Sequence, residues 1–116
     1  MPVLLLTTTG RRSGKRRRVP LTYLRDGEDL AIVASFGGSD QAPSWLLNLE
    51  HDSSASVQLD RVTVAVTART ADAVEQARLW PTVVGTYPGY ARYQARTHRP
   101  IPIVLLTPTG DHDPGR

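Results

Sequence analysis

The chain has 116 residues, of which 40% are hydrophobic and 22% are charged, and it contains no cysteine. This length favours one domain with a modest core, and the absence of cysteine excludes disulfides, thiol nucleophiles and thiolate metal sites. No apolar run approaches the roughly 20 residues of a membrane-spanning helix, and the sequence shows no signal peptide. We therefore expect a single cytoplasmic domain over residues 1–110, followed by a polar tail over residues 111–116.

An apolar run at residues 3–9 predicts a first strand, and a basic stretch from Gly10 to Arg18 follows it directly. Six of the 14 Lys and Arg lie in this stretch, although the net charge of the chain is only +3. Its two glycines permit backbone turns with positive φ, and Ser13 and neighbouring amides can donate into such a turn. The stretch predicts a loop that binds a phosphorylated ligand; the alternatives are a solvated hairpin turn and a nucleic-acid patch.

The remaining elements follow from the hydrophobic pattern. A second strand over residues 19–25 turns at Asp26-Gly27 into a third over residues 30–35. A short helix over 43–50 and a strand pair at 56–59 and 62–69 come next. A helix over 73–84, which Pro81 would kink or break, a helix over 87–97 and a sixth strand over 101–106 complete the domain. Helices that interrupt an antiparallel series predict a mainly β protein with α elements, a small barrel with packed helices.

A second glycine-rich segment follows the third predicted strand. Gly37 and Gly38 come after Ser35, and adjacent glycines at a strand end let backbone amides approach a ligand closely. A simple turn is the alternative interpretation. The three histidines lie far apart without ligand spacing, so we expect no metal site (His51, His98, His112).

Three of the four tyrosines recur at a helical spacing. Tyr87, Tyr90 and Tyr93 would lie within about one third of a helix circumference. Such a stripe fits either core packing or a ligand site, because tyrosine keeps a hydroxyl that needs a partner when buried. Trp45 and Trp80 are expected to anchor their helices in the core.

Several short segments, each weak alone, are specific together: Leu4 to Gly14, Pro20-Leu21, Leu24 to Gly27, Ala34 to Gly38, Pro43-Ser44-Trp45, Asn48-Leu49, Trp80-Pro81, Tyr87 to Tyr90, Tyr93-Gln94 and Ile101 to Val104. In these segments the chain resembles the deazaflavin (coenzyme F-420)-dependent nitroreductases of the mycobacterial type. The resemblance implies an α+β fold, a six-stranded antiparallel split β-barrel of the FMN-binding type with short packed helices.

The same resemblance implies where the cofactor lies. Its anionic tail would follow the basic loop and its deazaflavin ring would lie beside the tyrosine helix. The residues implied for cofactor binding are Arg11, Arg12, Ser13, Gly14, Arg17, Ser35, Gly37, Gly38 and Tyr87. Ser35 and Tyr90 are the implied catalytic residues, and the acceptor pocket would consist of Tyr87, Tyr90, Tyr93 and Trp45.

The implied activity is hydride transfer from C5 of reduced F-420 to a quinone, an activated alkene or a nitroaromatic compound. Two alternatives stay open: an FMN-dependent oxidoreductase on a similar barrel, and a non-enzymatic module that binds nucleic acid or another anion through the basic loop. We expect a small-molecule acceptor, no specific nucleic acid, and a monomer or weak homodimer. A quinone acceptor would add a peripheral contact with the membrane.

Overall fold

Seven antiparallel strands form one curled sheet with the order β2-β1-β5-β6-β7-β4-β3. The computed structural model describes residues 2–35 and 41–109. The strands are β1 (Val3–Thr9), β2 (Arg16–Thr22), β3 (Leu24–Asp26), β4 (Asp29–Val33), β5 (Ser54–Leu59), β6 (Val62–Thr70) and β7 (Ile103–Pro108). Three helices complete the fold: α1 (Ser44–His51), α2 (Ala73–Thr86) and α3 (Gly89–Ala95).

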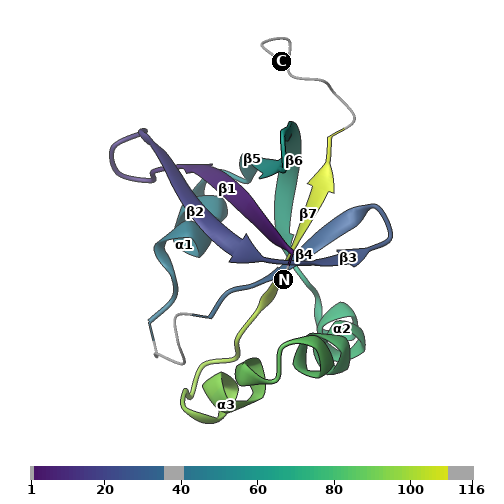
Figure 1. Ribbon diagram of the computed structural model, residues 1–116. Helices are drawn as coiled ribbons and strands as arrows, with labels where there is room; N and C mark the ends of the chain where they lie inside the picture. The colour runs from purple at the N-terminus through teal and green to yellow at the C-terminus, as the bar shows by residue number, and fades with distance from the viewer. Residues whose placement is uncertain (1, 36–40, 110–116) are drawn as a thin grey trace.

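The two edge strands of this sheet, β2 and β3, are consecutive in the chain, and Tyr23 alone separates them. Because one residue joins the edges, the sheet must curl until they meet, and Figure 1 shows the resulting split barrel. The expectation of six strands was therefore wrong by one. The predicted strand over 19–25 changes partner at Tyr23, since β2 pairs with β1 whereas β3 pairs with β4.

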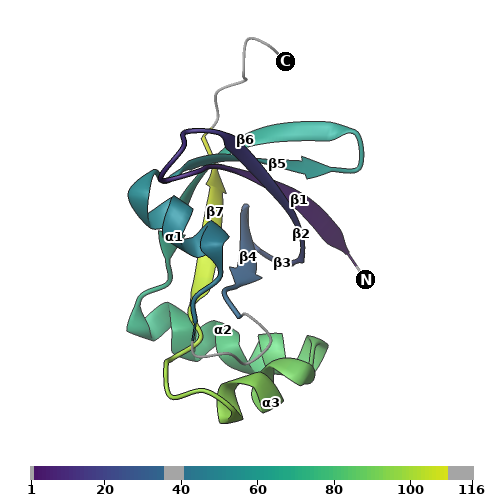
Figure 2. The same ribbon diagram turned by 90° about the vertical axis from the view of Figure 1, so that its left-hand side faces the viewer.

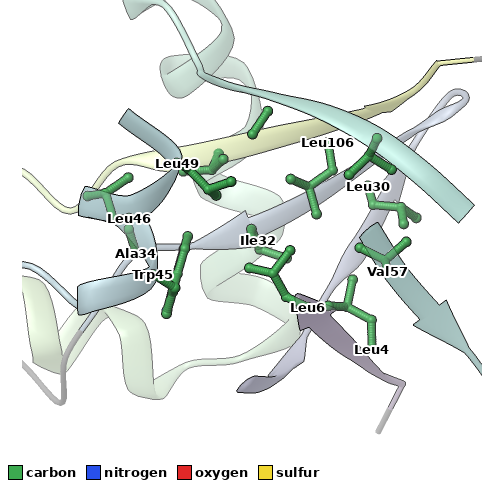
Figure 3. Packing of buried hydrophobic residues seen from close by; sticks show 13 residues of the cluster. Leu4, Leu6, Leu30, Ile32, Ala34, Trp45, Leu46, Leu49, Val57 and Leu106 are labelled. Carbon is green, nitrogen blue, oxygen red and sulfur yellow. The ribbon is translucent and has the colours of Figure 1, made fainter. Parts of the chain in front are cut away.

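The main core fills the barrel and is closed by α1 (Figure 3). Alternate residues of β1, among them Leu4 and Leu6, point inward and meet residues of β4, β5 and β7. Trp45, Leu46 and Leu49 of α1 pack onto this cluster, and Figure 2 shows α1 beside the loop between β1 and β2. The expected role of Trp45 as an anchor of its helix is confirmed, since its side chain is buried.

A second core lies on the opposite face of β4 and β7, under α2 and α3. Leu79 and Val83 of α2 pack there, with Trp80, Tyr90 and Tyr93 partly buried around them. Strands β4 and β7 are therefore buried on both faces, which explains their continuous apolar sequences. Both views place α2 and α3 side by side below the barrel (Figures 1 and 2).

Helix α2 runs from Ala73 to Thr86 without the break that Pro81 predicted. Asp72 and Glu75 form a reciprocal capping box at its start, and Pro81 lies on the exposed side of the helix. In residues 2–35 and 41–109, no helix is long and apolar enough to cross a membrane.

Candidate functional site

A groove of about 810 Å³ lies between the β1–β2 loop, strand β2 and the N-terminal end of α1. This volume is within the usual range for a small-molecule site. Its lining combines cationic, hydroxyl and apolar side chains: Thr8, Gly10, Arg11, Arg12, Ser13, Arg17, Arg18, Val19, Leu21, Ser35, Gln41, Ala42, Pro43, Ser44, Trp45 and Asn48. None of these described residues is acidic, so the groove favours an anionic ligand.

The loop that forms one wall is closed by its own backbone. The Gly10 amide donates to the Lys15 carbonyl at 2.7 Å, and the Gly14 amide donates to the Gly10 carbonyl at 2.8 Å. Gly14 has a φ of +72°, as expected, whereas Gly10 does not have a positive φ. Space favours glycine at position 10, because a Cβ there would make tight contacts of 3.1 Å with both the Lys15 carbonyl oxygen and the Ser13 hydroxyl oxygen.

Asn48 of α1 connects this loop to the body of the protein. Its side-chain oxygen accepts hydrogen bonds from the Arg11 backbone amide at 3.2 Å and from Arg11 Nη1 at 2.9 Å. Its side-chain nitrogen donates to the hydroxyl of Thr8 at 3.1 Å. Asn48 and Thr8 are both buried, so these contacts are shielded from water and fix the loop against the helix.

The other cations of the groove are not neutralised. Arg12, Arg17 and Arg18 are exposed, and their side chains form no recorded hydrogen bond or ion pair with any residue that the structure describes. Arg17 pairs in register with Thr8, so it projects from the sheet on the side that faces the groove. The guanidinium groups of Arg12 and Arg17 are thus available to an anion in the groove, whereas Arg18 pairs with Thr7 and projects from the other face of β2.

Part of the lining is apolar. It consists of Val19 and Leu21, which follow Arg17 along the same face of β2, together with Ala42, Pro43 and Trp45 at the start of α1. Pro43, the N-cap residue of α1, makes no side-chain capping hydrogen bond, and backbone amides at this end carry partial positive charge. The groove therefore offers charge beside the loop and an apolar surface for a planar ring further along β2.

The three tyrosines lie outside this groove, at the junction of α3 with strands β2 and β3. The Tyr87 hydroxyl donates to the Tyr23 carbonyl at 3.4 Å, and the Tyr90 and Thr22 hydroxyl oxygens are 3.3 Å apart. Their rings stack edge to face, with centroid separations of 6.0 Å for Tyr87–Tyr90 and 5.8 Å for Tyr90–Tyr93. The cluster contacts Thr22, the residue that follows the lining residue Leu21, but none of its tyrosines lines the groove.

The structure brings half of the twelve predicted site residues together in this groove. Arg11, Arg12, Ser13, Arg17, Ser35 and Trp45 all line the groove. Gly14 shapes the loop without lining the groove, and Gly37 and Gly38 lie outside the described residues. The contacts predicted between these three glycines and the cofactor remain predictions.

Asn48 and Arg18 are among the lining residues that sequence reasoning did not assign to the site. The signal for Asn48 is its place among the apolar residues of a short helix, because a polar side chain that is buried there needs a hydrogen-bond partner. Arg18 is one of three consecutive arginines, and the sequence alone did not distinguish it from its neighbours. In the part of the chain that the structure describes, no group of His, Asp and Glu side chains is arranged to hold a metal ion.

Comparisons with known proteins identify the family. A family model described as F420H(2)-dependent quinone reductase matches residues 1–108. An F420H(2)-dependent quinone reductase of Mycobacterium tuberculosis is 40% identical over 109 residues, which cover 91% of this chain and 73% of the relative.

Solved structures agree with this match. A structure of an F420-H2 dependent reductase superposes with a TM-score of 0.82 at 40% identity and covers 90% of this chain and 93% of its own. Another, described as a domain-swapped dimer, has the same TM-score and identity and covers 90% and 79%. A FAD-binding protein from Mesorhizobium loti, with a TM-score of 0.66 at 15% identity over 94% of this chain and 80% of its own, shows the split-barrel fold alone. With a family model over nearly its whole length and a relative of 40% identity, the chain belongs to the F420H(2)-dependent quinone reductase family.

Proposed function

We propose that the groove binds coenzyme F-420 with its anionic tail beside the cations of the loop and of β2 and its deazaflavin ring against the apolar residues. The observation that carries this proposal is a pair of guanidinium groups without acidic partners, those of Arg12 and Arg17, in a groove that is also lined by Val19, Leu21 and Trp45. The tail carries a phosphodiester and carboxylates, so its charge complements Arg12 and Arg17. When bound, the reduced cofactor supplies a hydride from C5 of its ring.

The chain's own contribution is mainly binding and orientation. Ser35 lines the groove, and Tyr90 contacts Thr22, the residue after the lining residue Leu21. We place the acceptor between these two hydroxyl groups, where they would polarise its oxygen while the hydride arrives. Reduction of a quinone to a hydroquinone then requires one proton, which comes from water or through a phenol.

Burial favours the protonated form of Tyr87. Burial, followed by the neighbouring Tyr90 and Tyr23, raises the pKa of the Tyr87 phenol above its ordinary value. Tyr87 is therefore a neutral hydroxyl donor at physiological pH. This property suits a site in which negative charge develops on an acceptor oxygen.

The acceptor range of this protein is part of the proposal. Quinone is the acceptor named for the family, and activated alkenes and nitroaromatics are electrophiles of the same kind. The test is anaerobic mixing of reduced F-420 with a soluble naphthoquinone, followed by absorbance of the oxidised cofactor. We expect oxidation in proportion to protein concentration. No protein-dependent oxidation with any of the three acceptor classes would contradict the proposal.

Two further expectations concern partners. Lys15 and Arg16 are exposed and do not line the groove, so they are free to approach an anionic membrane that holds a lipid-soluble quinone. Sedimentation with anionic vesicles, against neutral vesicles, tests this contact.

We also propose a monomer or weak homodimer, although a relative is described as a domain-swapped dimer. Light scattering over a range of protein concentrations would distinguish these states.

A further inference from the structure

We propose that Asn48 is a positioning residue that holds the Arg11 guanidinium by one nitrogen and turns its opposite edge toward an oxyanion of the cofactor's tail. This inference rests on the proposed function, because it concerns how the same groove binds the tail. It assigns to Asn48 a role exerted through Arg11.

The contacts of Arg11 are confined to one nitrogen of its guanidinium group. Nη1 donates to the Asn48 side-chain oxygen at 2.9 Å and approaches the Ser44 carbonyl oxygen at 3.5 Å. For Nε and Nη2, no partner is recorded among the described residues. These two nitrogens form the edge of a guanidinium that pairs with a carboxylate or phosphate through two parallel hydrogen bonds.

Both partners of Nη1 are neutral. An amide oxygen and a backbone carbonyl fix the orientation of Arg11 and leave its positive charge uncompensated. Aspartate at position 48 would occupy nearly the same volume and hold Arg11 equally well, but it would neutralise the charge that the tail requires. This difference explains why an amide suits the position better than a carboxylate.

The orientation of the amide is also fixed. The Arg11 backbone amide and Nη1 can only donate, so the side-chain oxygen of Asn48 must face Arg11, and Asn48 Nδ2 then donates to the hydroxyl oxygen of Thr8, a residue that is 2% exposed, at 3.1 Å. The same oxygen accepts the Arg11 backbone amide at 3.2 Å. Asn48 therefore holds both the backbone and the side chain of Arg11 before any ligand binds, which lowers the entropy cost of binding.

The test is a set of fluorescence titrations with oxidised F-420. The proteins are the wild type, Asn48→Ala, Asn48→Asp, Arg11→Met and the double variant Arg11→Met/Asn48→Ala. We expect Asn48→Ala to raise the Kd about tenfold, the effect of one hydrogen bond to a charged group. The double variant should bind no more weakly than Arg11→Met, because Asn48 has no role left once Arg11 is absent.

Asn48→Asp separates positioning from folding. We expect it to keep a melting temperature near that of the wild type while weakening F-420 binding at least as much as Asn48→Ala does. Additive effects in the double variant, or wild-type affinity in Asn48→Asp, would overturn the proposal. If the wild type does not bind F-420, both the proposed function and this inference fail. If the wild type binds F-420 and Asn48→Asp binds it with the same affinity, only the inference is contradicted.

Discussion

The hydroxyl oxygens of Tyr90 and Thr22 lie 3.3 Å apart and connect helix α3 to the last residue of strand β2. Leu21, the residue before Thr22, lines the groove. The contact therefore links the tyrosine cluster, which packs on the second core, to the strand that supplies Leu21 to the groove. We expect this junction to lie where the cofactor ring meets the acceptor.

Replacement of Tyr90 by Phe should lower kcat and leave cofactor binding unchanged. The phenol would polarise the acceptor oxygen, and loss of such a group typically costs about 10²-fold in rate. Steady-state kinetics with a soluble quinone and F-420 titrations would measure both effects. Tyr23→Phe is the matched control, since its hydroxyl has no recorded partner in the described part of the chain. An unchanged kcat in Tyr90→Phe would remove Tyr90 from the mechanism.

Charge reversal at Arg12 should weaken F-420 binding by about tenfold or more, because a carboxylate would replace a guanidinium that faces the anionic tail. The loss should be larger at low ionic strength, where charges are less screened. Arg61→Glu makes the same change in net charge in the β5–β6 turn, away from the groove (Figure 2). Equal losses in the two variants would indicate a general effect of net charge and contradict the assignment of Arg12.

Acid should weaken the start of helix α2 in a defined pH range. The Glu75 carboxylate accepts two hydrogen bonds from Arg69, at 2.6 and 2.7 Å, and one from the Asp72 backbone amide. These bonds lower the pKa of Glu75 from 4.5 to about 2. A carboxyl whose pKa is lowered by folding stabilises the protein above its unfolded pKa, and this stabilisation is lost as the pH falls toward the folded value.

The measurement is the melting temperature of the wild type and of Glu75→Gln between about pH 6 and pH 2. We expect the wild type to be the more stable above about pH 4.5 and its advantage to shrink as the pH approaches 2. High salt should reduce the difference at all pH values, because the pair is solvent-exposed. A difference that does not change with pH would show that the pair contributes through packing or capping alone.

Truncation of Leu6 to Ala should destabilise the barrel by about 2–5 kcal/mol, since the side chain is fully buried and its loss leaves a cavity. Urea unfolding would measure the change. Val62→Ala, at a side chain that is 61% exposed, should change the free energy of unfolding by less than about 0.5 kcal/mol. A loss of under 1 kcal/mol for Leu6→Ala would contradict the placement of β1 in the core.

The sequence predicted the elements whose periodicity is set locally. The first strand has the expected bounds, and the pair formed by β5 and β6 turns at Asp60, which takes a φ of 54° there. The division between β2 and β3 was not predictable from pattern, because residues 19–25 read as one continuous strand. The strand is divided at Tyr23 only because the residues before it pair with β1 and the residues after it pair with β4. This change of partner is a property of the closed barrel.

The site was predictable to the extent that it is local. The basic loop and Ser35 line one groove, as the resemblance implied. The role of Asn48 depends on contacts with Arg11 and Thr8, which lie 37 and 40 residues away in the chain. No short-range pattern encodes such contacts, so they required the three-dimensional structure.

The central claim is that the groove beside the basic loop is the F-420 site. Titration of the purified protein with oxidised F-420, followed by deazaflavin fluorescence and run beside FMN, tests it most directly. We expect micromolar or tighter binding to F-420, weaker binding to FMN, and loss of F-420 binding in a variant that combines Arg12→Glu with Arg17→Glu. Preferential binding of FMN, or F-420 affinity unaffected by these two substitutions, would contradict the account.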